Sequence, residues 1–174
     1  MKRKRFTDMK CSIARALEEV GEWWTLLIVR ECTEGKTRFD EFQKELGIAR
    51  NVLTDRLARL VELGILERFP LPDRANTEGY RLTGKGEELY PTIVALMQWG
   101  DKWLCPDDKP RIALVDTATG TLVDKLAVRA ADGRALGFKD VRFVEGPGAT
   151  SSTRLVIADR NQRVLGEFDT GEPA

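Results

Sequence analysis

The strongest constraint on the fold is a change of hydrophobic periodicity across residues 39–82. Apolar residues recur at helical spacing in the segment FDEFQKEL, which ends at a Gly-Ile turn, and again in the next segment, ARNVLTDRLARLVELG. Two short runs rich in strand-forming residues follow, ILERFPL and YRLT, separated by the polar stretch PDRANTEG. Helical spacing indicates amphipathic helices, and strand formers around a turn-forming stretch indicate a hairpin. We therefore predict a helix, a tight turn, a second helix and a hairpin, in that order.

This order of elements is typical of a winged helix-turn-helix. In that motif the second helix enters the major groove of DNA and the hairpin lies against the neighbouring backbone. The inner face of the second helix is marked by four apolar residues, Leu53, Leu57, Leu60 and Val61. Its outer face carries arginines. The order of the parts is more specific than any single residue within them.

Helical spacing continues on both sides of this unit. Apolar residues within 13–20 share one helical face, and Gly21 fits the C-cap of that helix. Residues 23–33 (WWTLLIVRECT) are apolar on nearly all sides, so we predict that they form the buried central helix. Thr83 fits the N-cap of the last helix. Pro91 should kink that helix, because proline removes a backbone donor.

The last helix of this block carries more apolar surface than one small domain can cover. Leu96, Trp99 and Trp103 are its bulkiest candidates for an interface. Large apolar faces mark interaction sites, so we predict that a second copy of the chain packs here. Packing within the same chain is the alternative. We assign the tryptophans to packing in preference to a ligand site.

A polar, proline-marked segment at residues 105–110 (CPDDKP) predicts a boundary. Beyond it the period alternates, and six runs read as short strands: RIALVD, TLVDKLAVRA, RALGF, DVRFVEG, STRLVIAD and RVLGEF. Turns are expected at Thr119-Gly120, Asp132-Gly133 and Gly146-Pro147-Gly148. We therefore predict an α+β chain with three parts: a basic tail (1–10), a winged helix-turn-helix domain with a long dimerisation helix (11–105) and a small all-β domain of unknown role (110–170).

The composition narrows the class of function. The chain has no histidine, the commonest general base and metal ligand, and its three cysteines show no paired spacing. It has neither a nucleophile elbow nor a phosphate-binding glycine loop. We therefore predict a protein that is not an enzyme and binds no cofactor or metal. No apolar run is long enough to span a membrane and the basic start lacks a signal-peptide core, so we expect a reduced, cytoplasmic protein without a membrane partner.

Three stretches resemble the HxlR-type winged-helix regulators, a branch near the MarR superfamily. These stretches are CSIARALEEVGEWWTLLIVREC, TRFDEFQKELGIARNVLTDRLARLVELGILER and YRLTGKGEELYPTIVALMQWGDKW, and together they cover about residues 11–105. The resemblance implies a bacterial transcriptional regulator that binds double-stranded DNA as a homodimer, with dimer contacts mainly from the first and last helices. Contacts at Ile13 and Leu17 of the first helix are implied by this resemblance. The tail resembles a ribbon-like extension of this branch in its DVR (140–142) and GPG (146–148) segments. The metal ligands of that extension are absent here, which implies a ribbon that folds without zinc.

The candidate DNA contacts lie on the second helix of the motif, in the hairpin and before the motif's first helix. Arg50 suits guanine, Asn51 suits adenine, and Thr54 suits a base or a phosphate. The other candidates are Arg56 and Arg59 as backbone clamps, Thr37 and Arg38 at a helix N-terminus, and Arg68, Arg74, Asn76, Thr77 and Arg81 in the hairpin. Arg74 is the strongest candidate within the hairpin. A solvated helix face is the alternative role for each arginine.

Cys11 is a candidate sensor of oxidants or electrophiles. It stands at or just before the start of the first helix, beside Lys10 and near Arg15, and such surroundings stabilise a thiolate. The resemblance points the same way, because several HxlR-type regulators carry a sensing cysteine at this place. The alternative is a small apolar residue within the dimer interface. For a small-molecule effector, we expect a site between the tail and the helical block.

A second class of function also fits the charge balance. Residues 1–108 hold 18 basic and 19 acidic residues, so the block is nearly neutral. A winged-helix scaffold that serves as a protein-interaction module, without sequence-specific DNA binding, is therefore the alternative. A positive stripe through Arg50, Arg56 and Arg74 would favour DNA, and its absence would favour a protein partner.

Overall fold

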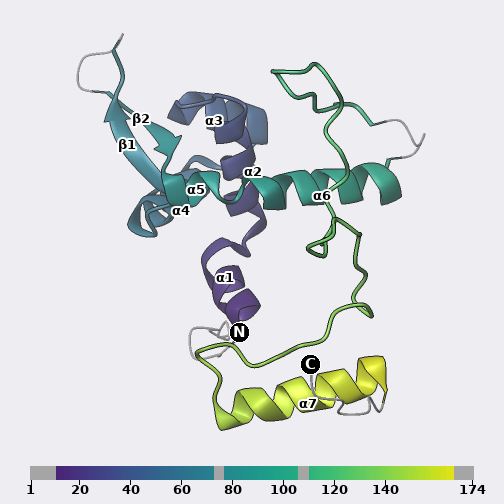
Figure 1. Ribbon diagram of the computed structural model, residues 1–174. Coiled ribbons are helices and arrows are strands. Elements are labelled where there is room, and N and C mark those ends of the chain that lie inside the picture. The colour runs from purple at the N-terminus through teal and green to yellow at the C-terminus, as the bar shows by residue number, and fades with distance from the viewer. Residues whose placement is uncertain (1–10, 73–76, 106–109, 167–174) are drawn as a thin grey trace. The chain divides into compact units, whose positions relative to one another are not determined.

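Figure 1 shows the computed structural model of the chain, which describes residues 11–72, 77–105 and 110–166. Contacts divide the chain into two compact units, residues 1–124 and residues 125–174. The described elements of the first unit are α1 (Ser12–Val20), α2 (Trp23–Thr33), α3 (Phe39–Leu46), α4 (Arg50–Glu62), β1 (Leu66–Pro70), β2 (Glu78–Leu82), α5 (Gly84–Glu87) and α6 (Tyr90–Trp103). The second unit contains α7 (Ser151–Leu165). The division falls after the predicted boundary at 105–110, since residues 110–124 group with the helical block.

The core of the first unit is built around α2, which contacts α1, α3, α4, α6 and β2. Its Ile28 and Val29 are fully buried and cluster with Phe42 of α3. The inward-facing leucines of α4, Leu53, Leu57 and Leu60, belong to the same cluster. The predictions of a central second helix and of the inner face of α4 are thus confirmed.

The turn between α3 and α4 has the geometry that the sequence predicts. Gly47 ends α3 in the left-handed region at φ 60°, which a side chain disfavours and glycine adopts readily. Ile48 follows as a buried residue, so the turn is held by the core as well as by the glycine. This turn sets where α4 begins, at Arg50.

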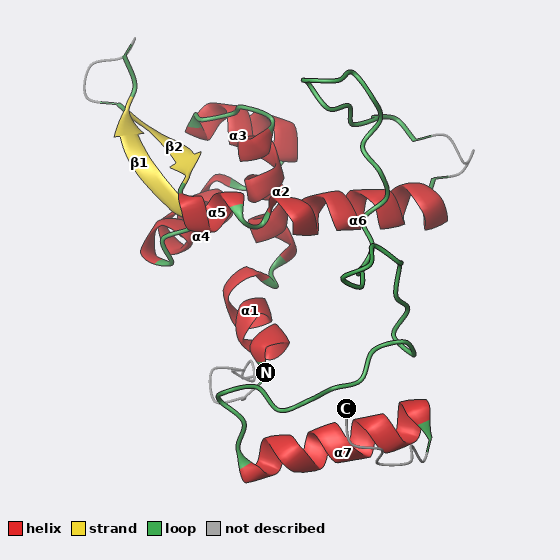
Figure 2. Cartoon of the chain, in the orientation of Figure 1, coloured by secondary structure: helices red, strands yellow, loops and turns green. Residues whose placement is uncertain are grey.

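The hairpin is a two-stranded antiparallel sheet, as Figure 2 shows, with pairing from Leu66 with Leu82 to Pro70 with Glu78. The backbone N–H of Tyr80 in β2 donates to the carbonyl of Thr37, just before α3, over 2.8 Å. A side chain at Gly79 would lie 3.0 Å from that same carbonyl oxygen. Glycine at 79 therefore permits the contact that ties the hairpin to the start of α3.

The prediction of one kinked helix after Thr83 is wrong, because the structure has two helices, α5 and α6. The Thr83 side chain caps α5, accepting a hydrogen bond from the Gly86 N–H over 3.2 Å, so its role as an N-cap is confirmed. Pro91 lies in the first turn of α6. The first backbone N–H groups of a helix have no partner within the helix, so proline loses nothing there and begins a helix instead of kinking one.

The all-β prediction for the tail is wrong over residues 151–165, which form α7. Among the described residues of the tail, strand pairing is limited to two isolated bridges, Val115 with Leu122 and Arg129 with Ala135. The turns predicted at Gly120 and Gly133 are confirmed, since both glycines have positive φ.

Side chains explain why a helix replaces the last strands. Thr150 caps α7 and exchanges hydrogen bonds with Thr153. The Asn161 side chain donates to the carbonyl of Phe143 over 2.8 Å and accepts from its N–H over 3.0 Å. The Arg160 guanidinium donates to the carbonyls of Phe138 and Val141. The helix thus satisfies the backbone groups that a neighbouring strand would otherwise pair with.

The tryptophans do not all pack within the chain. Trp24 lies against the core cluster, whereas Trp23, Trp99 and Trp103 are exposed in the single chain and lie outside its core. No helix in the described part of the chain is long and apolar enough to cross a membrane.

Candidate nucleic-acid interface

The first turns of α4 present several exposed polar side chains; Arg50, Asn51 and Thr54 are the ones we call the α4 patch, and the acidic Asp55 is exposed beside them. Asn51 lies on the face away from the buried leucines and Thr54 to one side of them, whereas Arg50 follows the same row as Leu57 and is exposed because it is the first residue of the helix. The guanidinium carbon of Arg50 lies 5.0 Å from the ring centre of Phe39 in α3, a cation–π contact. This contact orients Arg50 along the surface shared by α3 and α4.

The N-terminus of α3 is capped by its own acid. The Glu41 carboxylate accepts hydrogen bonds from the backbone N–H groups of Thr37 and Arg38, over 3.0 and 2.9 Å. These two amides are therefore occupied, and a phosphate at this helix end would meet a carboxylate in place of free donors. The side chains of Thr37 and Arg38 are half-buried.

Two arginines of α4 pair with acids. Arg56 is half-buried and its Nη2 lies 3.4 Å from Glu22, the N-cap of α2. Arg59 donates to Glu62 on the exposed end of α4 over 3.2 Å. The position of Arg56 links α4 to the α1–α2 junction, a role that the sequence did not reveal.

The arginines of the hairpin also have acidic partners. Arg81 donates to Glu67 across the two strands over 2.6 Å and lies over the ring of Phe69. Arg68 lies 3.6 Å from Glu78 and over the ring of Tyr80. Thr77 is exposed next to β2, while the predicted contacts Arg74 and Asn76 lie outside the described residues. Exposed ion pairs are weak, so phosphates can displace these carboxylates at a small energetic cost.

The buried carboxylate of Glu31 stabilises the turn between α2 and α3. Glu31 is 1% exposed; its carboxylate lies 2.6 Å from the Lys36 ammonium and also bonds Arg30. Burial raises the pKa of Glu31, but hydrogen bonds from Lys36 and Arg30 outweigh burial, so its pKa is lowered overall. Hydrogen bonds to Glu31 and, after it, to Glu34 raise the pKa of Lys36. Glu31 thus remains ionised and fixes the segment that leads into Thr37.

The five predicted interface residues share one property in the single chain. All are between 48% and 71% exposed: Ile13, Leu17, Leu96, Trp99 and Trp103. Tyr90 of α6, Leu104 just after α6 and Trp23 at the start of α2 are also exposed. A single chain therefore leaves a large part of α1 and α6 without apolar contacts.

The cysteines differ in their surroundings. Cys11 is exposed and is the N-cap residue of α1, where its carbonyl accepts from the Arg15 N–H over 3.0 Å. Burial, with a smaller contribution from the neighbouring Glu31, raises the pKa of Cys32 to about 12. Cys105 is half-buried. Within the described residues, no group of three or more Cys, Asp or Glu side chains is placed to hold a metal ion.

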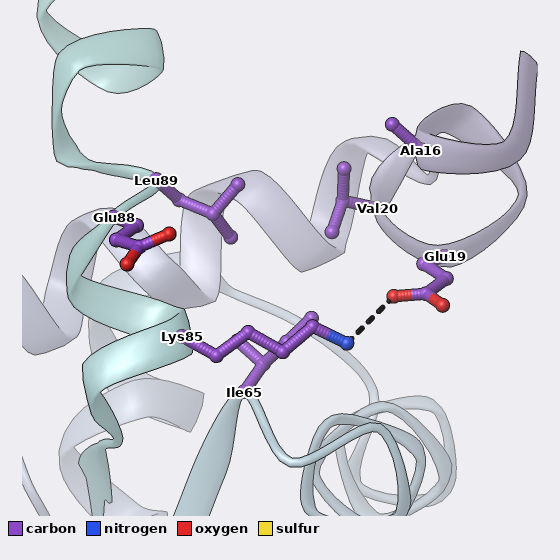
Figure 3. Close-up of a pocket in the computed structure, with 7 residues that line it drawn as sticks. All are labelled: Ala16, Glu19, Val20, Ile65, Lys85, Glu88 and Leu89. Carbon is purple, nitrogen blue, oxygen red and sulfur yellow. Dashed lines mark hydrogen bonds and ion pairs between the residues drawn. The ribbon is translucent and has the colours of Figure 1, made fainter. Parts of the chain in front are cut away.

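A small cavity of about 250 Å³ lies between α1, the start of β1 and the α5–α6 junction. Figure 3 shows its lining, in which Ala16, Val20, Ile65 and Leu89 are apolar. Lys85 reaches across one side to Glu19, 2.9 Å away, and also donates to the carbonyl of Leu63 over 3.0 Å. This cavity is below the usual size of a ligand site, and the Lys85–Glu19 pair is better understood as a link between α1 and α5.

Residues 19–108 of the chain match the HxlR-like helix-turn-helix family. The chain is 42% identical over 137 residues to MT3179 of Mycobacterium tuberculosis, named as an uncharacterised HTH-type transcriptional regulator, and the match covers 79% of this chain and 87% of that protein. Among solved structures, PA1607, named as a candidate transcription factor, is 40% identical with a TM-score of 0.75, covering 82% of this chain and 100% of its own. PA1374 of Pseudomonas aeruginosa, similarly named, is 39% identical with a TM-score of 0.57, covering 84% and 99%.

The family match spans α2 to α6, and the relatives extend it into the tail. Both the order of the elements and the buried faces of α2, α3 and α4 agree with a helix-turn-helix scaffold. The chain belongs to the HxlR-like helix-turn-helix family of transcriptional regulators.

Proposed function

We propose that this protein regulates transcription by binding duplex DNA as a homodimer, with α4 in the major groove and the hairpin against the adjacent backbone. The α4 patch carries this proposal. Arg50, Asn51 and Thr54 are exposed at the start of a helix whose leucine row is buried in the core. Donors and acceptors are thereby held on a rigid base at the end of the helix that enters the groove.

Within this proposal some polar residues contact the edges of the bases, and others contact the DNA backbone and so position the protein. Arg50 and Asn51 read base edges, while Thr37, Arg38, Thr54, Arg59 and the hairpin residues Arg68, Arg74, Asn76, Thr77 and Arg81 contact phosphate or sugar. Arg56 acts through Glu22, 3.4 Å away, by fixing the angle of α4. Phosphate contacts from side chains already paired with acids add slightly less net affinity, because each contact first breaks a weak, exposed ion pair.

Dimerisation is proposed through the exposed apolar residues of α1 and α6. A second copy would bury Ile13, Leu17, Leu96, Trp99 and Trp103, whose exposure in one chain is otherwise unfavourable. Two copies related by a two-fold axis present their α4 helices about one turn of DNA, ~34 Å, apart. The expected operator is therefore a palindrome-like sequence.

Arg50→Ala tests the proposal directly. In a fluorescence assay with the duplex upstream of its own gene, we expect the wild type to bind, with affinity falling steeply as salt rises. Loss of a bidentate contact to one base should weaken binding by ~1–3 kcal/mol and relax specificity at that position. Arg163→Ala in α7, which removes an equal charge from an exposed arginine, is the matched control. No binding at low salt, or equal binding by both variants, would contradict the proposal.

The protein-interaction module remains the second candidate. It is favoured by the acidic partners of the hairpin and α4 arginines, which reduce the positive potential of this surface. The same assay separates the two functions, because a protein-interaction module would show no salt-dependent affinity for any duplex.

Oxidant or electrophile sensing is proposed at Cys11, because it is exposed at the start of α1 whereas burial raises the pKa of Cys32. Modification of Cys11 would alter a helix of the proposed dimer interface. In the assay above, oxidant should weaken DNA binding by the wild type and leave Cys11→Ser unchanged. Equal responses of the two proteins would contradict this assignment.

A further inference from the structure

A second, larger cavity lies between α2 and α6. Its volume is about 590 Å³, within the ~300–1,000 Å³ typical of small-molecule sites. Its walls are mostly apolar, formed by Leu26 and Leu27 of α2, Ile93, Val94 and Met97 of α6, and Leu114 of the segment that follows α6. That segment is held near α6, where the Gln98 side chain donates to the carbonyl of Asp124 over 3.2 Å.

The cavity faces a different side of α6 from the proposed dimer interface. Ile93, Val94 and Met97 follow one row of the helix, whereas Trp99 and Trp103 follow another, since residues three or four apart share a face. The two rows meet at Leu96, which lines the edge of the cavity. A second copy docked on the tryptophans therefore leaves the row facing the cavity unoccupied.

One end of the cavity is polar and carries no net charge. This end is lined by Arg30 and Thr33 of the last turn of α2, by its C-cap Glu34, and by Tyr90 of α6. Arg30 and Lys36 are balanced by Glu31 and Glu34, which lie within ion-pair distance of them. The Nε of Arg30 is buried and makes no hydrogen bond to the described residues; the nearest acid, Glu34, is 3.7 Å away. A hydrogen-bond acceptor placed here would satisfy that donor after a small shift of the side chain.

We propose that this cavity binds an uncharged, largely apolar organic molecule that carries a carbonyl or hydroxyl oxygen. The apolar walls take the body of the molecule, and its oxygen accepts from Arg30. A charged head group is disfavoured, because the neutral cluster gives no net attraction to offset the loss of its hydration.

The same polar end is joined to the proposed DNA-binding elements. Lys36 bonds both Glu31 and Glu34, over 2.6 and 2.8 Å, and the next residue, Thr37, holds the hairpin through Tyr80. A molecule that moves Arg30 or Glu34 thus disturbs the segment that positions α3 and the hairpin. This regulatory consequence rests on the proposed DNA-binding function, whereas the binding site itself does not.

Prodan, an uncharged naphthalene ketone whose emission shifts to the blue in apolar surroundings, is the probe for this site. We expect saturable, blue-shifted emission with the full-length wild type. Met97→Trp should fill the cavity and weaken Prodan binding about tenfold, ~1.4 kcal/mol. Ala95→Trp, on an exposed position of the same helix outside the lining, should bind Prodan as the wild type does.

A second pair of variants covers the case in which Met97→Trp fails to fold by circular dichroism. Leu114→Trp changes the other wall of the cavity, and Leu122→Trp changes an exposed residue of the same segment outside the lining. Absence of saturable Prodan emission with the wild type, or equal binding by a folded cavity variant and its control, overturns the proposal.

A DNA-binding measurement separates this site from the proposed function. Saturating Prodan should weaken DNA binding by the wild type severalfold and leave a folded cavity variant unaffected. Unchanged DNA affinity with Prodan bound at the cavity overturns the regulatory consequence. A protein that binds Prodan at the cavity but never binds DNA supports the site and overturns the proposed function instead.

Discussion

The two units of the chain are stabilised in different ways. The winged-helix unit has a cluster of fully buried side chains contributed by α2, α3, α4 and the start of β1. In the described part of the second unit, no side chain is fully buried, and Phe138, Val144, Leu155 and Val156 are among its exposed apolar residues. That unit is held mainly by hydrogen bonds from Arg160 and Asn161 to the backbone of residues 138–143. Hydrophobic burial therefore stabilises the first unit, whereas local hydrogen bonds stabilise the second.

Leu57→Ala should cause the largest loss of stability in either unit. Leu57 is 0% exposed, so truncation should lower the free energy of unfolding by ~2–5 kcal/mol. Leu155→Ala makes the same change at a residue of α7 that is 73% exposed and should change it by less than ~0.5 kcal/mol. Urea denaturation followed by circular dichroism measures both. Similar losses for the two variants would show that the second unit has a core that one chain does not reveal.

Glu31→Gln tests the buried charge in the first unit. Loss of the ionised partner of Lys36 and Arg30 should lower the free energy of unfolding by ~1–3 kcal/mol. Because the pKa of Glu31 is lowered in the folded state, its contribution is present above the ordinary value of 4.5 and is lost as pH falls through the lower, folded pKa. The wild type should therefore lose stability relative to the variant below about pH 4.5. Parallel pH profiles for the two proteins would rule out this role.

Asn161→Ala should have the smallest effect and should stay local. It removes two hydrogen bonds to Phe143, and in this exposed setting each should contribute no more than ~0.5 kcal/mol, about 1 kcal/mol together. Hydrogen exchange should show faster exchange of the Phe143 amide with no change in the amides of α4. Protection of the Phe143 amide at the wild-type level would mean that burial against another surface holds this segment.

The sequence predicted the first unit well because its periodicity reflects its core. Leu53, Leu57 and Leu60 recur at helical spacing, and burial of that row is what fixes α4. The turn at Gly47 was likewise predictable from the local pattern. The exposure of Asn51 and Thr54 follows from the same periodicity, whereas Arg50 shares the row of Leu57 and is exposed because α4 begins there.

The remaining features depend on contacts that periodicity does not encode. Arg56 meets Glu22 from another helix, and Glu31 meets Lys36 across a turn, so neither pair has a local signature. Residues 151–165 alternate enough to resemble strands, but the cap at Thr150 and the side chains of Arg160 and Asn161 favour a helix. The capping role of Glu41 does have a local signal, an acid three residues after Arg38.

The bond between Tyr80 and Thr37 has a practical consequence for engineering. Because Gly79 leaves no room for a side chain against that carbonyl, the wing cannot be exchanged for one from a relative by swapping the hairpin residues alone. A transplanted wing would need the matching stretch before α3, and a glycine at the equivalent of position 79, to arrive at the same angle.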